Sequence, residues 1–193
     1  LSDLKYTNDT KGRIAEQYII DTVDLNRMWY GTAKKKKMPR NSVFELPMNV
    51  VFKSEKVKFS TMGVPSELSA LDWSKSMLFE PDAPNYPAVD LLVWDAEKKI
   101  LYAIQVTIKK VGEHMKDTLE IPKKEEAKES KWEALQGKWA SLLEKAKVEN
   151  VKIELVWLSD NTECNDDYKK SQWAVTFADV KEQFPLLAEL NKN

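Results

Sequence analysis

Hydrophobic residues along the chain follow two spacings, one typical of helices and the other typical of strands. Apolar positions that recur every three or four residues predict three helices, each with an apolar face. These helices span Lys11–Met28, which follows the capping residues of Thr7–Thr10, then about Pro122–Val148, and finally Ala178–Leu190. Shorter runs rich in Val, Ile and aromatic residues predict strands. The strands span Ser42–Phe52, Lys56–Thr61, Ala88–Trp94, Ile100–Ile108, Val151–Ser159 and Gln172–Phe177.

Three segments show neither spacing and are rich in polar residues or proline. We expect Tyr30–Asn41 and Asn161–Ser171 to be loops. Gly63–Pro87 is expected to be mainly a connection, with a short helix near Ser66–Ser74. This order of helix, strands, helix, strands and helix is typical of an α/β fold with a central mixed β-sheet flanked by helices. No internal repeat or long linker divides the 193 residues, so we expect a single domain over 1–193.

The segment Asn85–Thr107 contains the most informative departure from this pattern. It predicts a hairpin of two short strands that are almost continuously apolar, yet each strand carries a polar residue at a core position. Asp90 interrupts the first strand, and Gln105 interrupts the second. Burying a carboxylate without partners costs several kcal/mol, or raises its pKa until the group is neutral. This hairpin is therefore where a functional site is expected.

Counting residues back from the turn places the two polar side chains opposite each other. If the turn is Ala96–Lys99, Asp90 faces Gln105, with Cβ atoms about 4.5–5.5 Å apart. Thr107 and Lys109 follow Gln105 at every second position and share its face of the strand. A carboxylate and a carboxamide at this separation could share one metal ion, whereas a slip of one residue would separate them.

The first predicted helix offers a third oxygen ligand. Glu16 lies among apolar residues of this helix on a helical wheel, so its carboxylate could reach toward the sheet. The alternative is a glutamate that extends to the surface or pairs with Arg13 or Arg27, and helix faces alone favour that alternative.

Composition narrows the kinds of site that the chain can hold. Its 30 basic and 31 acidic residues nearly cancel, to a net charge of −1, so binding of a polyanion requires a local basic patch. A single cysteine, Cys164, and a single histidine, His114, exclude an internal disulfide, a cysteine cluster and a histidine-rich zinc site. No stretch has transmembrane length, no signal peptide begins at residue 1, and the first residue is Leu. We therefore expect no membrane partner, and we expect the chain to be a piece of a longer protein.

Two further features are candidates for contact with nucleic acid. A basic run could bind phosphates irrespective of base sequence, and a solvated loop is the alternative. This run consists of Lys34, Lys35, Lys36, Lys37 and Arg40. His114 lies in a segment that is expected to be a loop, where a lone histidine is more often simply solvated.

An acid on the first helix, an aspartate at the end of one strand and a pair of polar residues on the next strand form a known constellation. It resembles the PD-(D/E)xK nucleases, which have a restriction-endonuclease-like core. Pro87-Ala88-Val89-Asp90, followed by Ile104-Gln105-Val106-Thr107 and then His114, is similar to the nuclease-like domain of Crinkler effectors and of trypanosome retrotransposon hot spot proteins. The specific resemblance covers about Asn85–His114, and the order of elements extends it over most of the chain.

The resemblance implies a metal-dependent phosphodiesterase of the DNA endonuclease type. Asp90, Gln105 and Glu16 would bind Mg²⁺ or Mn²⁺, and a metal-activated water would attack the phosphodiester. The implied catalytic set is Asp90, Gln105, Thr107, Lys109, Glu16 and His114. DNA is the implied partner. Because Crinkler proteins are secreted effectors that act in host cells, commonly in the nucleus, the same setting is implied here.

Two positions depart from the general nuclease pattern. Gln105 stands where an acid is usual, which removes a negative charge and weakens magnesium binding. Thr107 replaces the lysine that would stabilise negative charge in the transition state, and Lys109, further along the same face, is the candidate to replace it. One alternative is a catalytically inactive nuclease-fold module that binds a host protein or nucleic acid. Another is an unrelated α/β domain in which Asp90 forms a structural hydrogen bond with Gln105.

Overall fold

A computed structural model shows the arrangement of these elements. It describes residues 8–26, 28–29, 32–37, 42–47, 50–51, 57–59, 65–82, 86, 88–108, 111–121, 128–159, 172–177 and 180–190. The helices are α1 (Asn8–Asn26), α2 (Val111–Leu119), α3 (Lys131–Lys145) and α4 (Leu187–Leu190), with a 3-10 helix, η1 (Ser66–Ala70). The strands are β1 (Met28–Trp29), β2 (Thr32–Lys37), β3 (Ser42–Pro47), β4 (Val50–Val51), β5 (Val57–Phe59), β6 (Met77–Pro81), β7 (Leu91–Asp95), β8 (Ile100–Thr107), β9 (Lys152–Ser159) and β10 (Gln172–Thr176).

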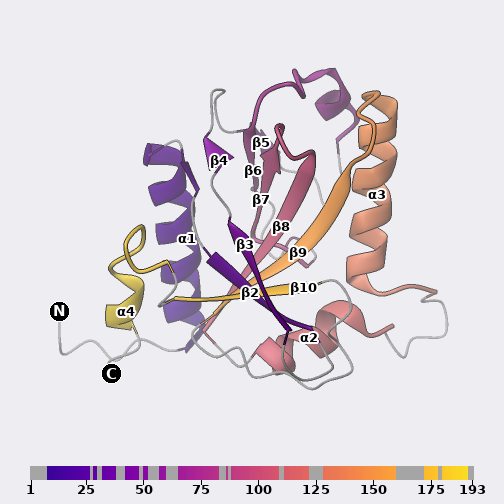
Figure 1. The fold of residues 1–193 in the computed structure, drawn as a ribbon. Coiled ribbons are helices and arrows are strands. Elements are labelled where there is room, and N and C mark those ends of the chain that lie inside the picture. The colour runs from indigo at the N-terminus through magenta and orange to yellow at the C-terminus, as the bar shows by residue number, and fades with distance from the viewer. Residues whose placement is uncertain are drawn as a thin grey trace.

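One mixed sheet organises the fold (Figure 1). Its strand order is β3-β2-β10-β9-β8-β7-β6-β5, and β6, β7 and β8 form an antiparallel meander within it. β9 lies parallel to β8, so the segment that contains α2 and α3 crosses over the sheet between them. β1 and β4 form a separate two-stranded sheet. The chain is therefore a mixed α/β fold with a central mixed sheet flanked by helices, as the sequence predicts.

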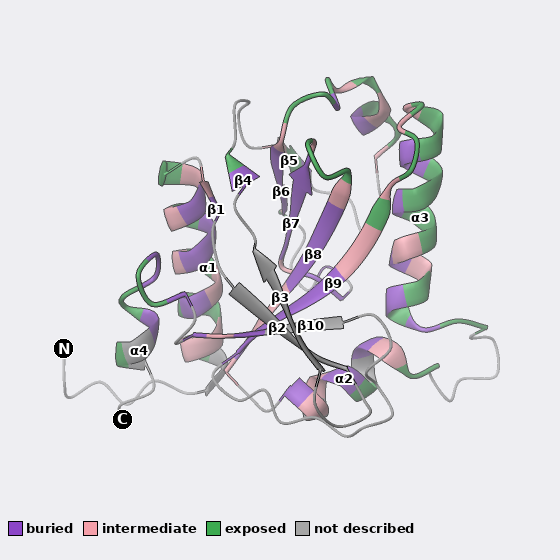
Figure 2. Ribbon diagram, viewed as in Figure 1, coloured by how far each residue is buried: buried purple, intermediate pink, exposed green. Residues whose placement is uncertain are grey.

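The central sheet separates two hydrophobic cores. Residues of α1 and α4 belong to one core, and residues of η1, α2 and α3 belong to the other; below, the two sides are called the α1 face and the α3 face. Along β8, Tyr102 and Ile104 lie on the α1 face, whereas Leu101 and Ala103 lie on the α3 face. Both faces of the central strands are thus covered (Figure 2), which explains the nearly continuous apolar runs of β7 and β8.

The hairpin between β7 and β8 has the predicted turn. Asp95 pairs with Ile100, so Ala96–Lys99 forms the connection. Asp95 Oδ1 accepts hydrogen bonds from the N–H groups of Glu97 (3.1 Å) and Lys98 (3.0 Å). Lys99 has a positive φ of 55°, which closes the turn. The register of this hairpin is therefore set locally, by a side chain that bonds the backbone of its own turn.

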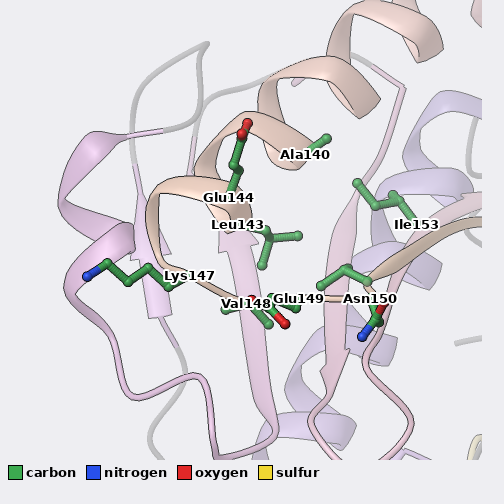
Figure 3. Close-up of a pocket in the computed structure, with 9 residues that line it drawn as sticks. Ala140, Leu143, Glu144, Lys147, Val148, Glu149, Asn150 and Ile153 are labelled. Atoms are coloured by element: carbon green, nitrogen blue, oxygen red, sulfur yellow. The ribbon is translucent and has the colours of Figure 1, made fainter.

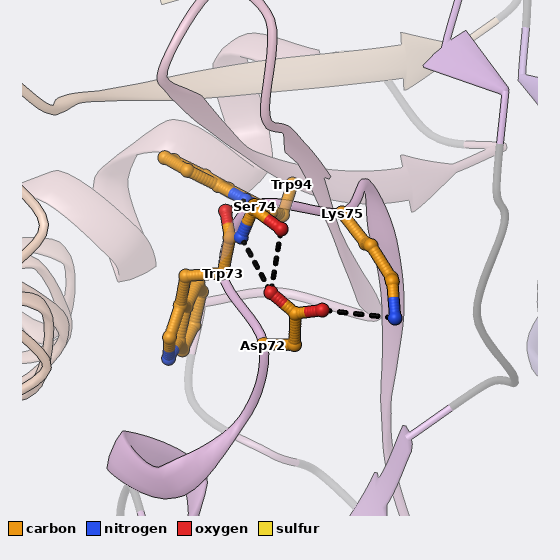
Figure 4. A network of polar contacts seen from close by, with 5 residues as sticks. All are labelled: Asp72, Trp73, Ser74, Lys75 and Trp94. Atoms are coloured by element: carbon orange, nitrogen blue, oxygen red, sulfur yellow. Dashed lines mark hydrogen bonds and ion pairs between the residues drawn. The ribbon is translucent and has the colours of Figure 1, made fainter.

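Polar contacts also hold the connection between η1 and β6 (Figure 4). The Asp72 carboxylate accepts from Ser74 N (3.2 Å) and Ser74 Oγ (2.6 Å), and it lies 2.8 Å from Lys75 Nζ. Trp94 Nε1 donates to Trp73 O at 3.0 Å, which ties this connection to β7. An exposed polar turn is thus anchored by a buried indole.

Two strands lie where connections are expected. β6 occupies part of Gly63–Pro87, where several prolines suggest a connection but Met77–Pro81 is an apolar run that pairs with β7. β2 occupies part of the predicted loop Tyr30–Asn41. Its four lysines give no strand signal, and its conformation comes from pairing with β3 and β10. In both segments, tertiary pairing overrides local composition.

Helix boundaries also differ from those predicted. α3 begins at Lys131 rather than near Pro122, because Ser130 and Glu133 form a capping box. The residues that precede α3 include a separate helix, α2, which contains His114. Within the predicted closing helix Ala178–Leu190, the described residues 180–190 form turns and the short α4. Within the described part of the chain, no helix is long and apolar enough to cross a membrane.

The capping box predicts a measurable contribution to stability. Ser130 is buried, and its Oγ accepts from Glu133 N at 3.2 Å, while Ser130 N donates to Glu133 Oε2 at 2.9 Å. We expect Ser130→Ala to lower the free energy of unfolding by about 1 kcal/mol in urea titrations. Ser141→Ala, at an exposed position of the same helix, should change it by less than about 0.5 kcal/mol. Equal effects of the two substitutions would contradict this assignment.

Candidate functional site

Asp90 lies at an irregularity where β7 begins. The ladder between β7 and β8 pairs Leu91 with Ile104, which is the register that the turn predicts. The Asp90 N–H, however, also donates to Ile104 O, at 2.9 Å. Two successive residues of one strand thus face a single residue of its partner, which is the arrangement of a β-bulge. A bulge interrupts the alternation of side chains and changes the direction in which Asp90 points.

The bulge separates Asp90 from Gln105, so the predicted facing of these two side chains is wrong. Asp90 Oδ2 accepts a hydrogen bond from Val106 N at 2.6 Å. Gln105 Oε1 instead accepts from Thr118 Oγ1 of α2, at 3.4 Å. Counting from the turn assumes a regular ladder, and nothing in the sequence marks the extra residue. The hydrogen bonds also argue against the alternative in which Asp90 and Gln105 form a structural pair.

Backbone strain occurs two residues before Asp90. Ala88 is buried and has a φ of 66°, a left-handed conformation that costs an alanine on the order of 1–2 kcal/mol. Val89, between them, is also buried. Strained backbone persists only where its surroundings impose it, and it is enriched at binding and catalytic sites. The strained residue and the bulge both lie directly before β7, and together they set the direction of the Asp90 side chain.

Glu80 is a buried carboxylate beside Asp90 that the sequence pattern did not single out. β6 pairs Phe79 with Leu92, so Glu80 lies opposite Leu91 on the neighbouring strand. Paired residues share a face of a sheet, and Leu91 belongs to the α1 face, which places Glu80 there too. Only 7% of Glu80 is exposed. The sequence signal for Glu80 is a single acid within the apolar run Met77–Pro81. Because the prolines around this run predict a connection, the sequence does not indicate that Glu80 is buried in a strand.

Two carboxylates between α1 and the sheet, those of Asp90 and Glu16, have raised pKa values. Burial and then the charge of Glu16 raise the pKa of Asp90 to about 8, against the opposing effect of the hydrogen bond from Val106 N–H. Burial also raises the pKa of Glu16, which Arg13 opposes and Glu80 reinforces. The structure therefore brings Glu16 into electrostatic range of Asp90 and adds Glu80 to the group.

The acids at this position have the donor chemistry of a site for a hard divalent cation. Mg²⁺ and Mn²⁺ prefer carboxylate oxygens, and a cation near two acids that repel each other would relieve the repulsion. Within the described ranges, no group of three His, Cys, Asp or Glu side chains is arranged to hold a metal ion. Gln105 is engaged by Thr118, so Asp90 and Glu16 are the residues that would hold the ion.

Two other predicted site residues lie near the end of β8. Thr107 is buried and pairs with Ser159 of β9. His114 lies on α2 rather than in a loop, one helical turn before Thr118. Residues four apart share a helix face, so His114 lies on the same side of α2 as the hydrogen-bond partner of Gln105.

The predicted basic residues are placed only in part. Lys34–Lys37 belong to β2, between β3 and β10, and not to a loop. Their side chains lie outside the described part of the chain, as do Lys109 and Arg40 altogether. The predicted roles of these residues in phosphate contact and catalysis therefore stay predictions.

Two hollows on the described part of the surface are lined by residues other than Asp90. One, of about 560 Å³, lies between the end of α3 and the start of β9 (Figure 3) and includes Leu143, Lys147 and Ile153. Another, of about 540 Å³, lies beside η1 and α3 and includes Gly137 and Lys145. Neither is lined by a predicted site residue. Buried acids with raised pKa values occur more often at functional sites than elsewhere, which favours the group around Asp90 as the candidate site.

No family model matches the chain, and no curated protein or solved structure matches it either.

The raised pKa of Asp90 predicts how stability changes with pH. The folded state holds this proton more tightly than the unfolded state, whose aspartate titrates near 3.8, so stability should fall as pH rises from about 4 to about 8. Asp90→Asn should flatten this slope and, at pH 9, raise the free energy of unfolding by about 2 kcal/mol or more. Urea unfolding at pH 5, 7 and 9 measures both effects.

A matched control is available for this pH experiment. Hydrogen bonds from Lys75 and then Ser74 lower the pKa of the exposed Asp72 to about 2, so Asp72 stays ionised between pH 5 and 9. Asp72→Asn therefore removes a charge but no group that titrates in this range. That variant should retain the parent slope. The same slope in Asp90→Asn would contradict the raised pKa.

Proposed function

We propose that the chain is a metal-dependent phosphodiesterase, with a restriction-endonuclease-like core, that cleaves DNA. The order of elements supports this: α1, the antiparallel strands β6, β7 and β8, then α3 and the parallel strand β9. The observation that carries the proposal is the position of Asp90. Its carboxylate is held at the bulge by Val106 N–H, next to the acid of α1 on which the resemblance depends.

The residues of the chain would contribute in distinct ways. Asp90 and Glu16 would hold Mg²⁺ or Mn²⁺, which when bound supplies a more acidic water and charge stabilisation. The hydrogen bond from Val106 N–H orients the Asp90 carboxylate and limits its rotation. Burial around Asp90 strengthens the electrostatic interactions at the site because it lowers the local dielectric constant.

Contacts to DNA are also part of this proposal. The lysines of β2 would bind phosphates in a manner independent of base sequence, together with Arg40. His114 and Thr107 would act near the end of β8, and Lys109 would supply positive charge. By the same resemblance, we propose that the protein works as a secreted effector in a host cell, commonly in the nucleus.

A second candidate function is supported by the position of Gln105. Its carbonyl oxygen is engaged by Thr118, and the lysine position of the nuclease pattern holds the buried Thr107. A site with two acids and a threonine at the lysine position of the pattern suits a module that keeps the nuclease fold but binds a host protein or nucleic acid without cutting.

Plasmid cleavage distinguishes these two functions. The parent chain should relax or linearise plasmid DNA with Mg²⁺ or Mn²⁺ and not with EDTA. Asp90→Ala and Glu16→Gln should each lower the rate about 100-fold or more, because each removes charge at the proposed metal site. Asp72→Ala, at an exposed acid that is ion-paired with Lys75 and is not part of the proposed site, should retain the parent rate.

Calorimetric titration with Mn²⁺ gives an independent measurement. The parent should bind the ion, and Asp90→Ala should bind it at least about tenfold more weakly. Absence of both cleavage and Mn²⁺ binding in the parent would contradict the nuclease proposal and support the non-cutting module.

A further inference from the structure

A lysine lies on the same side of the sheet as the acidic group. β5 pairs with β6 in a register that sets Lys58 directly beside Glu80. Lys58 Nζ lies 3.5 Å from Glu80 Oε2 and 3.8 Å from Asp82 Oδ1. Because β6 in turn sets Glu80 beside Leu91, a row runs across three strands from Lys58 through Glu80 to the bulge at Asp90.

The spacing of strands gives the scale of this row. Neighbouring strands lie about 4.8 Å apart, so the backbone of Lys58 lies about 10 Å from that of Leu91, two strands away. Lysine carries its ammonium group on a flexible four-carbon stem, which gives it freedom to approach a ligand bound between these strands.

Exposure distinguishes the two members of the ion pair. The Lys58 side chain is 51% exposed, whereas that of Glu80 is 9% exposed. The ammonium group therefore remains accessible to an anion in solution while the buried carboxylate retains it at this edge of the sheet. An ion pair with one exposed partner contributes little to stability, so stability alone gives a weak reason for the arrangement.

We propose that Lys58 contacts a phosphate oxygen of the phosphodiester bound beside Asp90, in the role for which the sequence suggests Lys109. This inference rests on the proposed phosphodiesterase function. A phosphodiester that approaches Asp90 and Glu16 meets two acids of its own charge, and a cation on the same face offsets that repulsion. Glu80 and Asp82 act as positioning residues that hold Lys58 on this side.

DNA binding without metal tests the phosphate contact separately from cleavage. A fluorescently labelled DNA duplex is titrated with the protein in EDTA at several salt concentrations, and anisotropy gives the affinity. Lys58→Met should weaken binding and reduce the slope of log K against log salt by about one, as for one lost phosphate contact. Lys58→Arg should retain the slope.

Lys75 provides the matched control. Its side chain is 52% exposed, and it is also ion-paired with an aspartate. It lies just before the start of β6, whereas Lys58 lies beside Glu80, near the end of that strand. Lys75→Met should leave the salt slope and the cleavage rate unchanged. An effect equal to that of Lys58→Met would show that any exposed lysine contributes, and would overturn the proposal.

Cleavage and metal binding complete the test. Lys58→Met should lower the cleavage rate about 100-fold while its affinity for Mn²⁺ stays within about threefold of the parent. Lys58→Arg should restore part of the rate, because the charge is kept. Thermal unfolding verifies that each variant is folded, and Lys58→Gln replaces Lys58→Met if the latter unfolds.

The outcomes separate the two proposals. If Lys58→Met cleaves and binds DNA as the parent does while Asp90→Ala loses cleavage, Lys58 has no such role and the proposed function stands. If the parent neither cleaves DNA nor binds Mn²⁺, the phosphodiesterase function fails. In that case a reduced salt slope in Lys58→Met still supports the phosphate contact, and an unchanged slope overturns it.

Discussion

Burial of the central strands on both faces is the constraint on which the rest of the structure depends. β7, β8 and β9 lie between the α1 face and the α3 face, so most of their side chains are apolar. A charged residue at the end of such a strand has to be held by hydrogen bonds and by neighbouring charges. Asp90 meets this requirement through Val106 N–H, at a bulge that follows the strained Ala88.

The bulge decides which residues share a face with Asp90. In a regular ladder Asp90 would face Gln105, and the two would form one site. The extra residue instead leaves Asp90 in electrostatic range of Glu16, on the side where Glu80 and Lys58 lie in a row. Gln105 pairs with Thr118 of α2. The candidate site is thus an acidic group with a lysine at its edge, rather than a carboxylate and carboxamide pair.

The same group explains why stability and function are expected to oppose each other. Carboxylates whose pKa values are raised in the folded chain, chiefly by burial, reduce its stability as they ionise. A bound cation or a nearby ammonium group offsets that cost. Because this acidic group lowers stability, a role in binding explains its presence better than a structural role does. The hollows beside α3 have no comparable group of buried acids in their lining.

Sequence by itself determined the α/β class, the hairpin with its Ala96–Lys99 turn and the approximate positions of α1 and α3, and it singled out Asp90 as a polar residue at a core position. These follow from local periodicity and turn chemistry, which depend on residues close together in the chain. Only the tertiary structure decided that β2 and β6 are strands, that Asp90 lies in a bulge, and that Lys58, Glu80 and this bulge form a row across β5, β6 and β7. Those features depend on pairing between distant segments, and an inserted residue in a ladder leaves no periodic signal in the sequence.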